Sequence, residues 1–364
     1  MSEQDAARGA SEGPGGEPRP HVIYGLDPSY FTQKVLGFFR YKEIPHEYRW
    51  KTLTAAPEVE KRAGTRLIPV VVTPEREWMW DSTPIAFEMD RRFPQSALLP
   101  PIETHPVLHV AGRILEDFFD EWPTRQAVHF RWMMDTGIYT SGTEIALNQI
   151  GLPGDAKPDS EGQQMVFKLR EILKSWGLDV CRNVGADRRN AEEMEGELVR
   201  MMQLVAQHAE WEDFLLGPRP SLPDFALLGA LEGHFLRDPI PAKLIERHAA
   251  GVIDYAERLK AARASTAAPW PAEDRFAETL APLLQYAALT FHTFLRANRK
   301  ALAEEREWLA IDIGYGTTRM KARKYAEKTR RMTAAAIAAL PEDAKKRVEE
   351  ALEPLGVLDV YRLD

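Results

Sequence analysis

The chain of 364 residues contains a single cysteine, Cys181. One cysteine excludes an intrachain disulfide and any metal site built from several thiolates, and it favours a reducing compartment. The sequence has no run of about 18 apolar residues, so it predicts no membrane-spanning helix. The formal net charge of −8 argues against a general nucleic-acid-binding protein, which usually carries a basic domain.

The strings that mark several enzyme classes are also missing. The chain has no H-E-x-x-H, P-loop or G-x-S-x-G motif, and its nine histidines are scattered. We therefore expect no metal site. IDIGYGTTR (residues 311–319) resembles the first phosphate loop of the actin-like ATPases, but the chain that remains is far too short for that fold. This segment is interpreted as a glycine-rich turn.

Length and composition fit two domains with appended segments. The apolar content of 44% with 28% charged residues is typical of a soluble globular protein. Residues 1–20 are rich in Gly, Pro, Ser and Glu and lack the apolar core of a signal peptide. They are interpreted as a disordered tail on a cytoplasmic protein.

Residues 21–100 alternate between strand and helix signals. HVIYGL, EYRWKTL, RLIPVVVTP and WMWD are short, β-branched or aromatic segments, whereas TQKVLGFFRYK and STPIAFEMDRRFP have apolar residues at helical spacing. The order β-α-β followed by β-β-α predicts a small mixed sheet with helices on its faces.

From residue 105 on, strand signals nearly vanish. ALLPPIETHP is a proline-bearing linker, and amphipathic segments predict helices near 161–176, 190–214, 222–236, 240–262 and 274–309. We expect an all-α domain over 105–262 and a helical C-terminal extension of unknown role over 263–364. Within it, RMKARKYAEKTRR (319–331) is interpreted as a solvated helical face, with a docking surface for an anionic partner as the alternative.

Two short segments of the first domain could hold a ligand. Ile68–Pro69 opens a strand, where a proline costs no ladder hydrogen bond; if the bond were cis, the backbone groups of Ile68 could pair with a peptide-like ligand. Ser82 follows a strand and is a natural N-cap, and the helix start favours a carboxylate while Asp81 could accept from an ammonium. The pair fits an α-amino acid head, although a strand-start proline and a helix cap explain these residues equally well.

These segments occur in a familiar order. LDPSYFTQKV (26–35), the string Tyr41-Lys42-Glu43-Ile44-Pro45, RLIPVVV and WMWDSTPIAFEMDRRFP resemble the N-terminal domain of glutathione transferases, whose strings read "R-K-G-I-P", "I-P-V-V" and "D-S-x-x-I". FLLGPRPSLPDFALLGAL (214–231) resembles the "F-L-x-G-x-x-P-S-x-A-D" signature of that family, with Ser221 and Asp224 as a structural capping box. The chain is therefore identified as a member of the superfamily, serine-type and bacterial-like. The resemblance implies a thioredoxin-like α/β domain followed by an all-α domain.

The resemblance also implies a glutathione cradle. Asp81 and Ser82 match the positions that bind the γ-glutamyl head, and Ile68 and Pro69 match the cis-proline pair that holds the cysteinyl moiety. Ser29 matches the hydroxyl that faces the thiol, which would lower the thiol pKa and supply a nucleophile.

Some positions depart from the family pattern or match it loosely. Tyr30 replaces the usual proline and is a second hydroxyl candidate for the thiol, while Thr32 is interpreted as the cap of the helix that follows. Lys51 or Arg66 could meet the glycine carboxylate of glutathione. An apolar wall for the electrophile is expected from the first helix of the all-α domain, through Phe118, Phe119 and Trp122.

The implied function is a glutathione transferase-like enzyme that activates the thiol of its co-substrate glutathione for attack on a small apolar electrophile. The alternative is a non-catalytic member of the same fold that binds a ligand or a protein. A cytoplasmic homodimer without nucleic-acid partners is expected from the composition and the resemblance.

Overall fold

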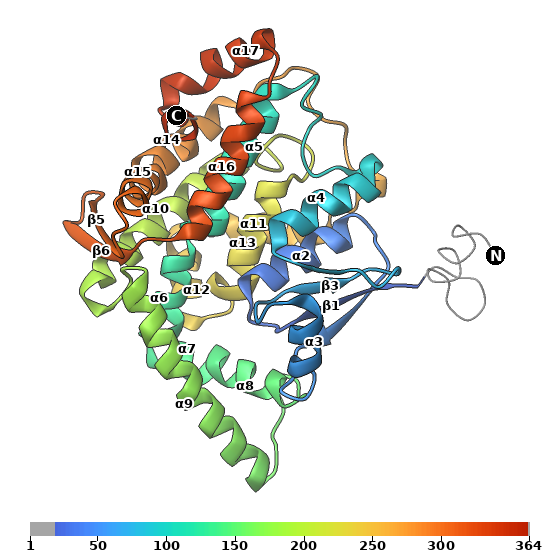
Figure 1. The fold of residues 1–364 in the computed structure, drawn as a ribbon, viewed down its shortest axis with the longest axis vertical. Coiled ribbons are helices and arrows are strands. Elements are labelled where there is room, and N and C mark those ends of the chain that lie inside the picture. The colour runs from blue at the N-terminus through green and yellow to red at the C-terminus, as the bar shows by residue number, and fades with distance from the viewer. Residues whose placement is uncertain (1–18, 363–364) are drawn as a thin grey trace.

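The computed structural model describes residues 19–362, so the predicted tail over 1–20 lies almost entirely outside the described residues. Figure 1 shows a small sheet with its helices at one side of the molecule and a larger body of helices around and above it. A β-α-β and β-β-α order is followed by helical segments, which confirms the predicted fold class.

The sheet contains four strands in the order β2-β1-β3-β4: β1 (His21–Gly25), β2 (His46–Trp50), β3 (Val70–Val72) and β4 (Trp78–Trp80). Strand β1 runs parallel to β2 and antiparallel to β3, which is antiparallel to β4. Successive side chains alternate between the two faces. Ile23 and Val71 join the main core with α2 (Tyr30–Tyr41) and α4 (Ser82–Arg92), whereas Tyr24 and Val70 pack with α3 (Ala56–Ala63).

The two helices predicted in this domain, α2 and α4, begin one to three residues earlier than predicted, and the short α3 was not predicted. Helix α2 begins at Tyr30, and its N-cap is Ser29, whose Oγ accepts from the Thr32 N–H at 3.4 Å. The assignment of Thr32 as the cap was therefore wrong. In α4 the N-cap position belongs to Asp81, and Ser82 is the first helical residue rather than the cap.

The helical domain is built around α5 (Pro106–Glu121) and α11 (Leu222–Ala230), whose residues are almost all buried. The capping box of Ser221 and Asp224 at the start of α11 is present, as predicted. Its other helices are α6 (Thr124–Trp132), α7 (Asp135–Gly137), α8 (Thr143–Gln149), α9 (Ser160–Asn183), α10 (Ala191–Ala209), α12 (Pro239–His248) and α13 (Gly251–Ala261), with π-helical turns at Ile138–Gly142 and Leu231–Phe235.

Two glycines set the distance between the two domains. A Cβ at Gly229 would lie 2.6 Å from the Tyr30 carbonyl oxygen, and a Cβ at Gly233 would lie 2.8 Å from the Tyr30 Cα. Only a residue without a side chain allows α11 and the turn after it to approach α2 this closely. The start of α2 is therefore pressed against the helical domain.

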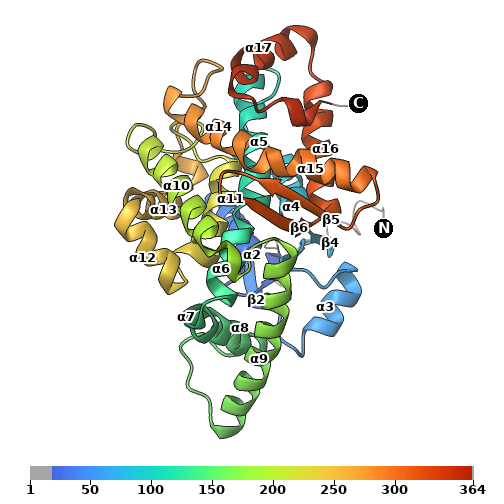
Figure 2. The same ribbon diagram turned by 90° about the vertical axis from the view of Figure 1, so that its left-hand side faces the viewer.

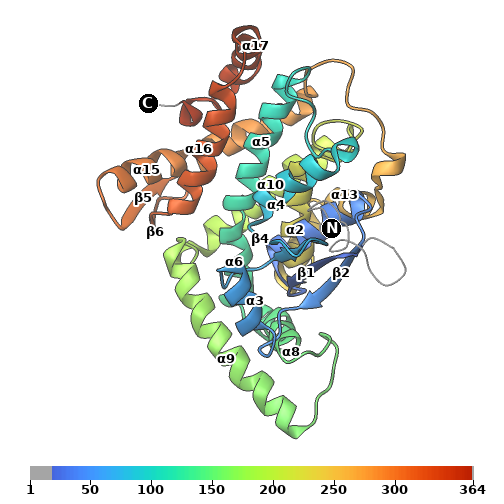
Figure 3. The same cartoon turned by 45° about the vertical axis from the view of Figure 1, so that its right-hand side comes forward.

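The C-terminal extension packs back along the helical domain. It contains α14 (Ala281–Leu289), α15 (Phe291–Ala303), α16 (Lys324–Ala338) and α17 (Glu342–Leu352). Helices α16 and α17 contact α5, and Figures 1 and 3 show α16 running alongside it.

Short 3₁₀ turns occur in all parts of the chain. They lie at Pro94–Ser96, Arg188–Asn190, Ala264–Thr266, Glu278–Leu280, Glu353–Leu355 and Asp359–Tyr361.

The extension is not wholly helical, in contrast to the prediction. Strands β5 (Trp308–Asp312) and β6 (Thr317–Lys321) form an antiparallel hairpin beside α15, visible in Figure 2. Leu309 and Ile311 alternate with exposed residues, which is the period of a half-buried strand. The glycines of IDIGYGTTR do lie in the connecting turn, where Gly314 and Gly316 have positive φ.

The basic segment 319–331 is not simply a solvated face. It covers the end of β6, a bend and the first half of α16. Arg330 is 3% exposed, pairs with Glu327 at 2.8 Å and donates to the Val360 carbonyl at 2.6 Å. The segment therefore combines a buried arginine with exposed basic residues such as Lys324 and Arg331. No helix within residues 19–362 is both long and apolar enough to cross a bilayer.

Candidate functional site

A cavity of about 280 Å³ lies where the sheet domain, the helical domain and the C-terminal extension meet. All three parts of the chain contribute to its walls. The lining residues are Phe31, Leu67, Ile68, Trp80, Asp81, Ser82, Asp120, Glu121, Thr124, Val128, Val180, Val184, Arg323 and Tyr325. Three of the six predicted site residues, Ile68, Asp81 and Ser82, are among them.

The strand pairing explains why these three residues meet. Val70, the first residue of β3, pairs with Trp80, the last residue of β4, in an antiparallel register. The segment before β3 and the segment after β4 therefore lie at the same edge of the sheet. Ile68 comes from the first segment, where its bond to Pro69 is cis, and Asp81 from the second.

Asp81 has an unusual backbone conformation. Its φ is +75°. This left-handed conformation is strained for any residue that carries a Cβ, and such strain clusters at functional sites. Its carboxylate makes no capping hydrogen bond to α4. Instead, Oδ1 accepts from the Tyr325 hydroxyl at 2.5 Å and Oδ2 lies 3.3 Å from Nζ of Lys328. The first N–H groups of α4 thus have no side-chain cap, and such groups attract a ligand carboxylate.

Buried carboxyl groups from α5 form the opposite wall. Glu121 lies 3.3 Å from Nη1 of Arg323, and burial raises its pKa to about 7 despite this charge. Asp120 lies 2.5 Å and Glu116 2.6 Å from Nζ of the fully buried Lys34. Burial alone lowers the pKa of Lys34, but these two carboxylates raise it above its ordinary value. The cluster joins α2 to α5 directly behind the cavity.

Tyr30, a predicted thiol-facing residue, does not line the cavity. It is 4% exposed, and its hydroxyl donates to the carbonyl oxygen of Phe119 in α5. The helical partner of that carbonyl would be the N–H of residue 123, which is a proline and has none. The tyrosine hydroxyl therefore satisfies a carbonyl that Pro123 leaves unpaired.

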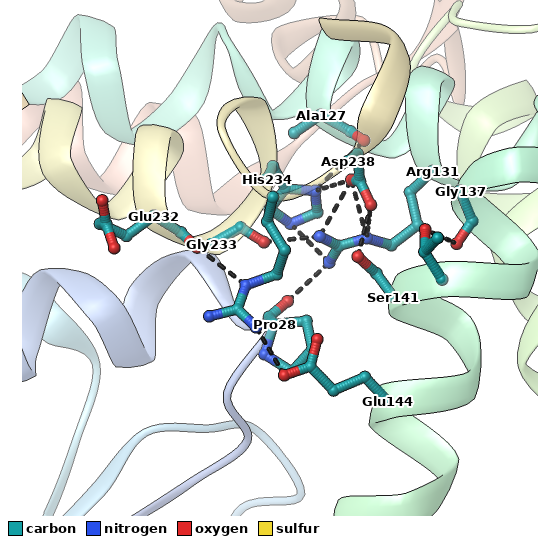
Figure 4. Close-up of polar contacts among 12 residues, drawn as sticks. Pro28, Ala127, Arg131, Gly137, Ser141, Glu144, Glu232, Gly233, His234 and Asp238 are labelled. Atoms are coloured by element: carbon teal, nitrogen blue, oxygen red, sulfur yellow. Dashed lines mark hydrogen bonds and ion pairs between the residues drawn. The ribbon is translucent and has the colours of Figure 1, made fainter. Parts of the chain in front are cut away.

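Ser29 and the loop before it are held by the helical domain. Arg131 donates to the Pro28 carbonyl from Nη1 at 2.6 Å and pairs with Asp238 at 3.0 Å, while the Ser141 hydroxyl donates to the same carboxylate at 2.5 Å. Figure 4 shows these groups converging below the turn that carries His234. Burial and the Arg131 charge lower the pKa of His234 well below its ordinary value, so this histidine is neutral. The Asp238 carboxylate therefore balances the charge of Arg131 alone. Ser29 is half-buried and is not a lining residue.

The two residues considered for the glycine carboxylate, Lys51 and Arg66, do not line the cavity. Nζ of Lys51 donates to the Arg66 carbonyl at 2.6 Å and pairs with Glu60 at 2.9 Å, and the Arg66 side chain points to solvent with 92% exposure.

The expected apolar wall is also different. Phe118, Phe119 and Trp122 are at most 1% exposed and belong to the main core, so their assignment to the cavity was wrong. Phe31, Val128 of α6, Val180 of α9 and Val184, which caps the end of α9, line it instead.

Sequence reasoning also missed the lining residues of the extension. Arg323 and Tyr325 lie more than 200 residues after the sheet domain, and no local pattern links them to Asp81. The only signal was the concentration of basic residues over 319–331.

Cys181 is not a nucleophile in this conformation. Its side chain is fully buried, as predicted for a small hydrophobic residue, and burial raises its pKa to about 12. Within residues 19–362 no three His, Cys, Asp or Glu side chains gather so that they could hold a metal ion.

Residues 28–92 match the family described as glutathione S-transferase, N-terminal domain. No curated protein matches the chain. Similar solved structures include a tau-class glutathione S-transferase from mango, Mangifera indica (16% identity over 67% of this chain and 90% of that one, TM-score 0.41). Others are a glutathione S-transferase of Methylobacterium radiotolerans in complex with glutathione sulfonate (18%, 71% and 100%, 0.39) and the β-etherase LigF of Sphingobium sp. (15%, 68% and 97%, 0.45). Residues 28–92 therefore match a glutathione S-transferase N-terminal domain, and they lie in a sheet domain with the thioredoxin-like topology.

Proposed function

We propose that the cavity binds glutathione and that the protein is a glutathione transferase-like enzyme acting on a small apolar electrophile. The observation that carries the proposal is the meeting of Ile68, Asp81 and Ser82 in one cavity at the start of α4. A peptide with an α-amino acid head needs these groups: a helix N-terminus for the carboxylate, an acid for the ammonium and a backbone edge for the peptide part.

In the proposed complex, the head carboxylate binds the first N–H groups of α4 and the hydroxyl of Ser82. The ammonium binds Asp81, and the cysteinyl part lies along the backbone of Ile68 beside Pro69. The thiol then lies toward Phe31 and the valine wall, where an apolar electrophile would be held. The thiol first releases its proton to solvent, and the thiolate sulfur then attacks the electrophilic carbon. A carbon–sulfur bond forms, and the leaving group departs with its electron pair.

Ser29 is the proposed activating hydroxyl. Its Oγ accepts from the Thr32 N–H, which leaves its O–H able to donate to a thiolate. The N-terminus of α2 adds a favourable potential, and both effects lower a thiol pKa. Tyr30 is a weaker candidate because its hydroxyl is buried and already donates to Phe119.

A second function has its own support. Neither predicted hydroxyl lines the cavity, and Asp81 already contacts Tyr325 and Lys328. These contacts favour a non-catalytic member that binds a ligand or a protein partner. The cytoplasmic location proposed for either function is supported by the single cysteine, and a homodimer is proposed on the resemblance alone.

Calorimetric titration with glutathione tests the binding proposal. We expect binding in the wild type and a loss of about 1–3 kcal/mol in Asp81→Ala, because an ammonium loses its charged acceptor. Asp179→Ala is the matched control, since Asp179 is an exposed acid that pairs with Arg182 and is not a lining residue. If Asp81→Ala binds as tightly as the control, the carboxylate does not hold the ligand head.

The pKa of the bound thiol, measured from thiolate absorbance, separates the two functions. Ser29→Ala should raise this pKa and Tyr30→Phe should leave it unchanged. An unchanged thiol pKa in both variants, with glutathione still bound, would favour the non-catalytic member.

A further inference from the structure

The C-terminal extension reaches the residue that is proposed to hold the ligand ammonium. Tyr325 and Lys328 lie one turn apart at the start of α16, and each contacts one carboxylate oxygen of Asp81. The Asp81 side chain is 6% exposed and that of Lys328 is 50% exposed. The two partners therefore cover the carboxylate from the solvent side, and the lysine itself remains accessible.

The surroundings of the Lys328 ammonium are those of an ammonium-binding site. Its Nζ lies 3.3 Å from Asp81, 5.3 Å from the centre of the Tyr325 ring and 6.0 Å from the centre of the Trp80 ring. A carboxylate flanked by aromatic rings is the combination that attracts a cationic nitrogen. Trp80, Asp81 and Tyr325 also line the cavity. The lysine thus occupies the position that the amino group of an amino acid head requires.

We propose that Lys328 is an internal competitor for the ammonium site, and that a ligand with an α-amino acid head binds by displacing it from Asp81. This inference rests on the proposed glutathione site and adds a residue that sets its affinity. Tyr325 stays in place and becomes part of the site, because its hydroxyl donates to Asp81 and keeps lone pairs that can accept from a ligand ammonium.

The anchoring of α16 permits such an exchange. Arg330 is buried and fixed to Glu327 and to the Val360 carbonyl, and Arg323 pairs with Glu121 and lies over the Phe294 ring at 4.3 Å. These contacts hold the helix on both sides of Lys328. The flexible four-carbon stem of a half-exposed lysine can turn into solvent without moving the helix.

The test compares two ligands on two proteins by calorimetry. The ligands are glutathione and glutaryl-cysteinylglycine, which is the same tripeptide without the amino group. The variant is Lys328→Met, which keeps the apolar stem and removes the charge. Lys324→Met is the control, because Lys324 is an exposed lysine one turn earlier on α16 and is not a partner of Asp81.

We expect Lys328→Met to bind glutathione about two- to fivefold more tightly than wild type, the range set by losing a half-exposed ion pair as competitor. Glutaryl-cysteinylglycine has no ammonium to place at Asp81, so its affinity should not increase. Lys324→Met should match the wild type for both ligands.

Three outcomes would overturn the inference while leaving glutathione binding intact. The first is an unchanged affinity for glutathione in Lys328→Met. The second is a weaker affinity of this variant for both ligands, which would show that the lysine binds a ligand carboxylate. The third is an equal gain in affinity for both ligands. If neither the wild type nor Lys328→Met binds glutathione at millimolar concentration, the proposed function itself fails. Binding by Lys328→Met alone would support both proposals.

Discussion

Two ion pairs near the junction of the sheet domain with later parts of the chain differ in burial. Arg131 and Asp238 are 2% and 1% exposed and fix the loop before α2 (Figure 4). Lys328 and Asp81 join α16 to the segment before α4, and the lysine is 50% exposed. The buried pair lies away from the cavity lining, whereas Asp81 is part of it.

The difference separates a fixed contact from one that can open. Removing one member of a buried pair leaves a charge in a low-dielectric environment, which is costly. A half-exposed lysine regains water when its partner is taken, so its contact contributes little net free energy. We infer that the loop before α2 is held permanently and that the contact of Asp81 with Lys328 can exchange.

The largest expected effect is on the buried pair. Asp238→Ala should lower the free energy of unfolding by about 3–5 kcal/mol, because Arg131 is left buried without its counter-ion. Urea denaturation measures this loss, with Asp179→Ala as the control for an exposed acid, where under about 1 kcal/mol is expected. Similar values for the two variants would show that the Arg131 cluster does not hold the loop.

Glu121 predicts a pH dependence on the cavity side. Its folded-state pKa of about 7 lies above the ordinary 4.5, so the folded protein keeps a proton that the unfolded chain releases between these values. Its contribution to stability is full below about pH 4.5 and is lost as the pH rises through 7.

The variant Glu121→Gln cannot ionise and isolates this contribution. From about pH 5 to about pH 8, it should gain stability relative to wild type by up to ~3 kcal/mol, measured by urea denaturation at each pH. A stability difference that stays constant over this range would show that Glu121 is already ionised at pH 5.

Tyr30→Phe tests the buried contact between α2 and α5 by removing one hydroxyl group. The variant should lose about 1–2 kcal/mol of stability, because the Phe119 carbonyl loses the donor that replaces the missing N–H of Pro123. Thermal or urea unfolding measures the loss, and glutathione affinity should be unchanged. An unchanged stability combined with weaker glutathione binding would return Tyr30 to the ligand site.

The smallest effect is expected at the exposed pair. Lys328→Met should change the free energy of unfolding by less than about 1 kcal/mol, since its contact with Asp81 is half-exposed. The same urea titration used for Asp238→Ala checks this value. A loss near that of Asp238→Ala would remove the distinction between fixed and exchangeable contacts.

The sheet domain was predictable because its signals are local. Short β-branched and aromatic segments located β1 to β4, and antiparallel pairing of β3 with β4 then brings Ile68 near Asp81. The capping box at Ser221 was also readable, since both members lie within one helical turn. Such features depend on residues close in the sequence.

The cavity walls were less predictable because they depend on long-range packing. The orientation of Tyr30 follows from Pro123, and the loss of Phe118 to the core follows from the packing of α5 against its neighbours. Hairpin β5–β6 was missed because its alternating pattern is short and interrupted by glycines. Tyr325 has no local feature that points to Asp81.

The contact between Asp81 and Tyr325 joins residues 244 positions apart. During synthesis, the sheet domain emerges long before α16, so Asp81 is open to solvent until α16 has been made. Closing a loop of this length is slow compared with local folding. The cavity is therefore among the last parts of the molecule to be completed, because its wall at Asp81 waits for Tyr325 and Lys328.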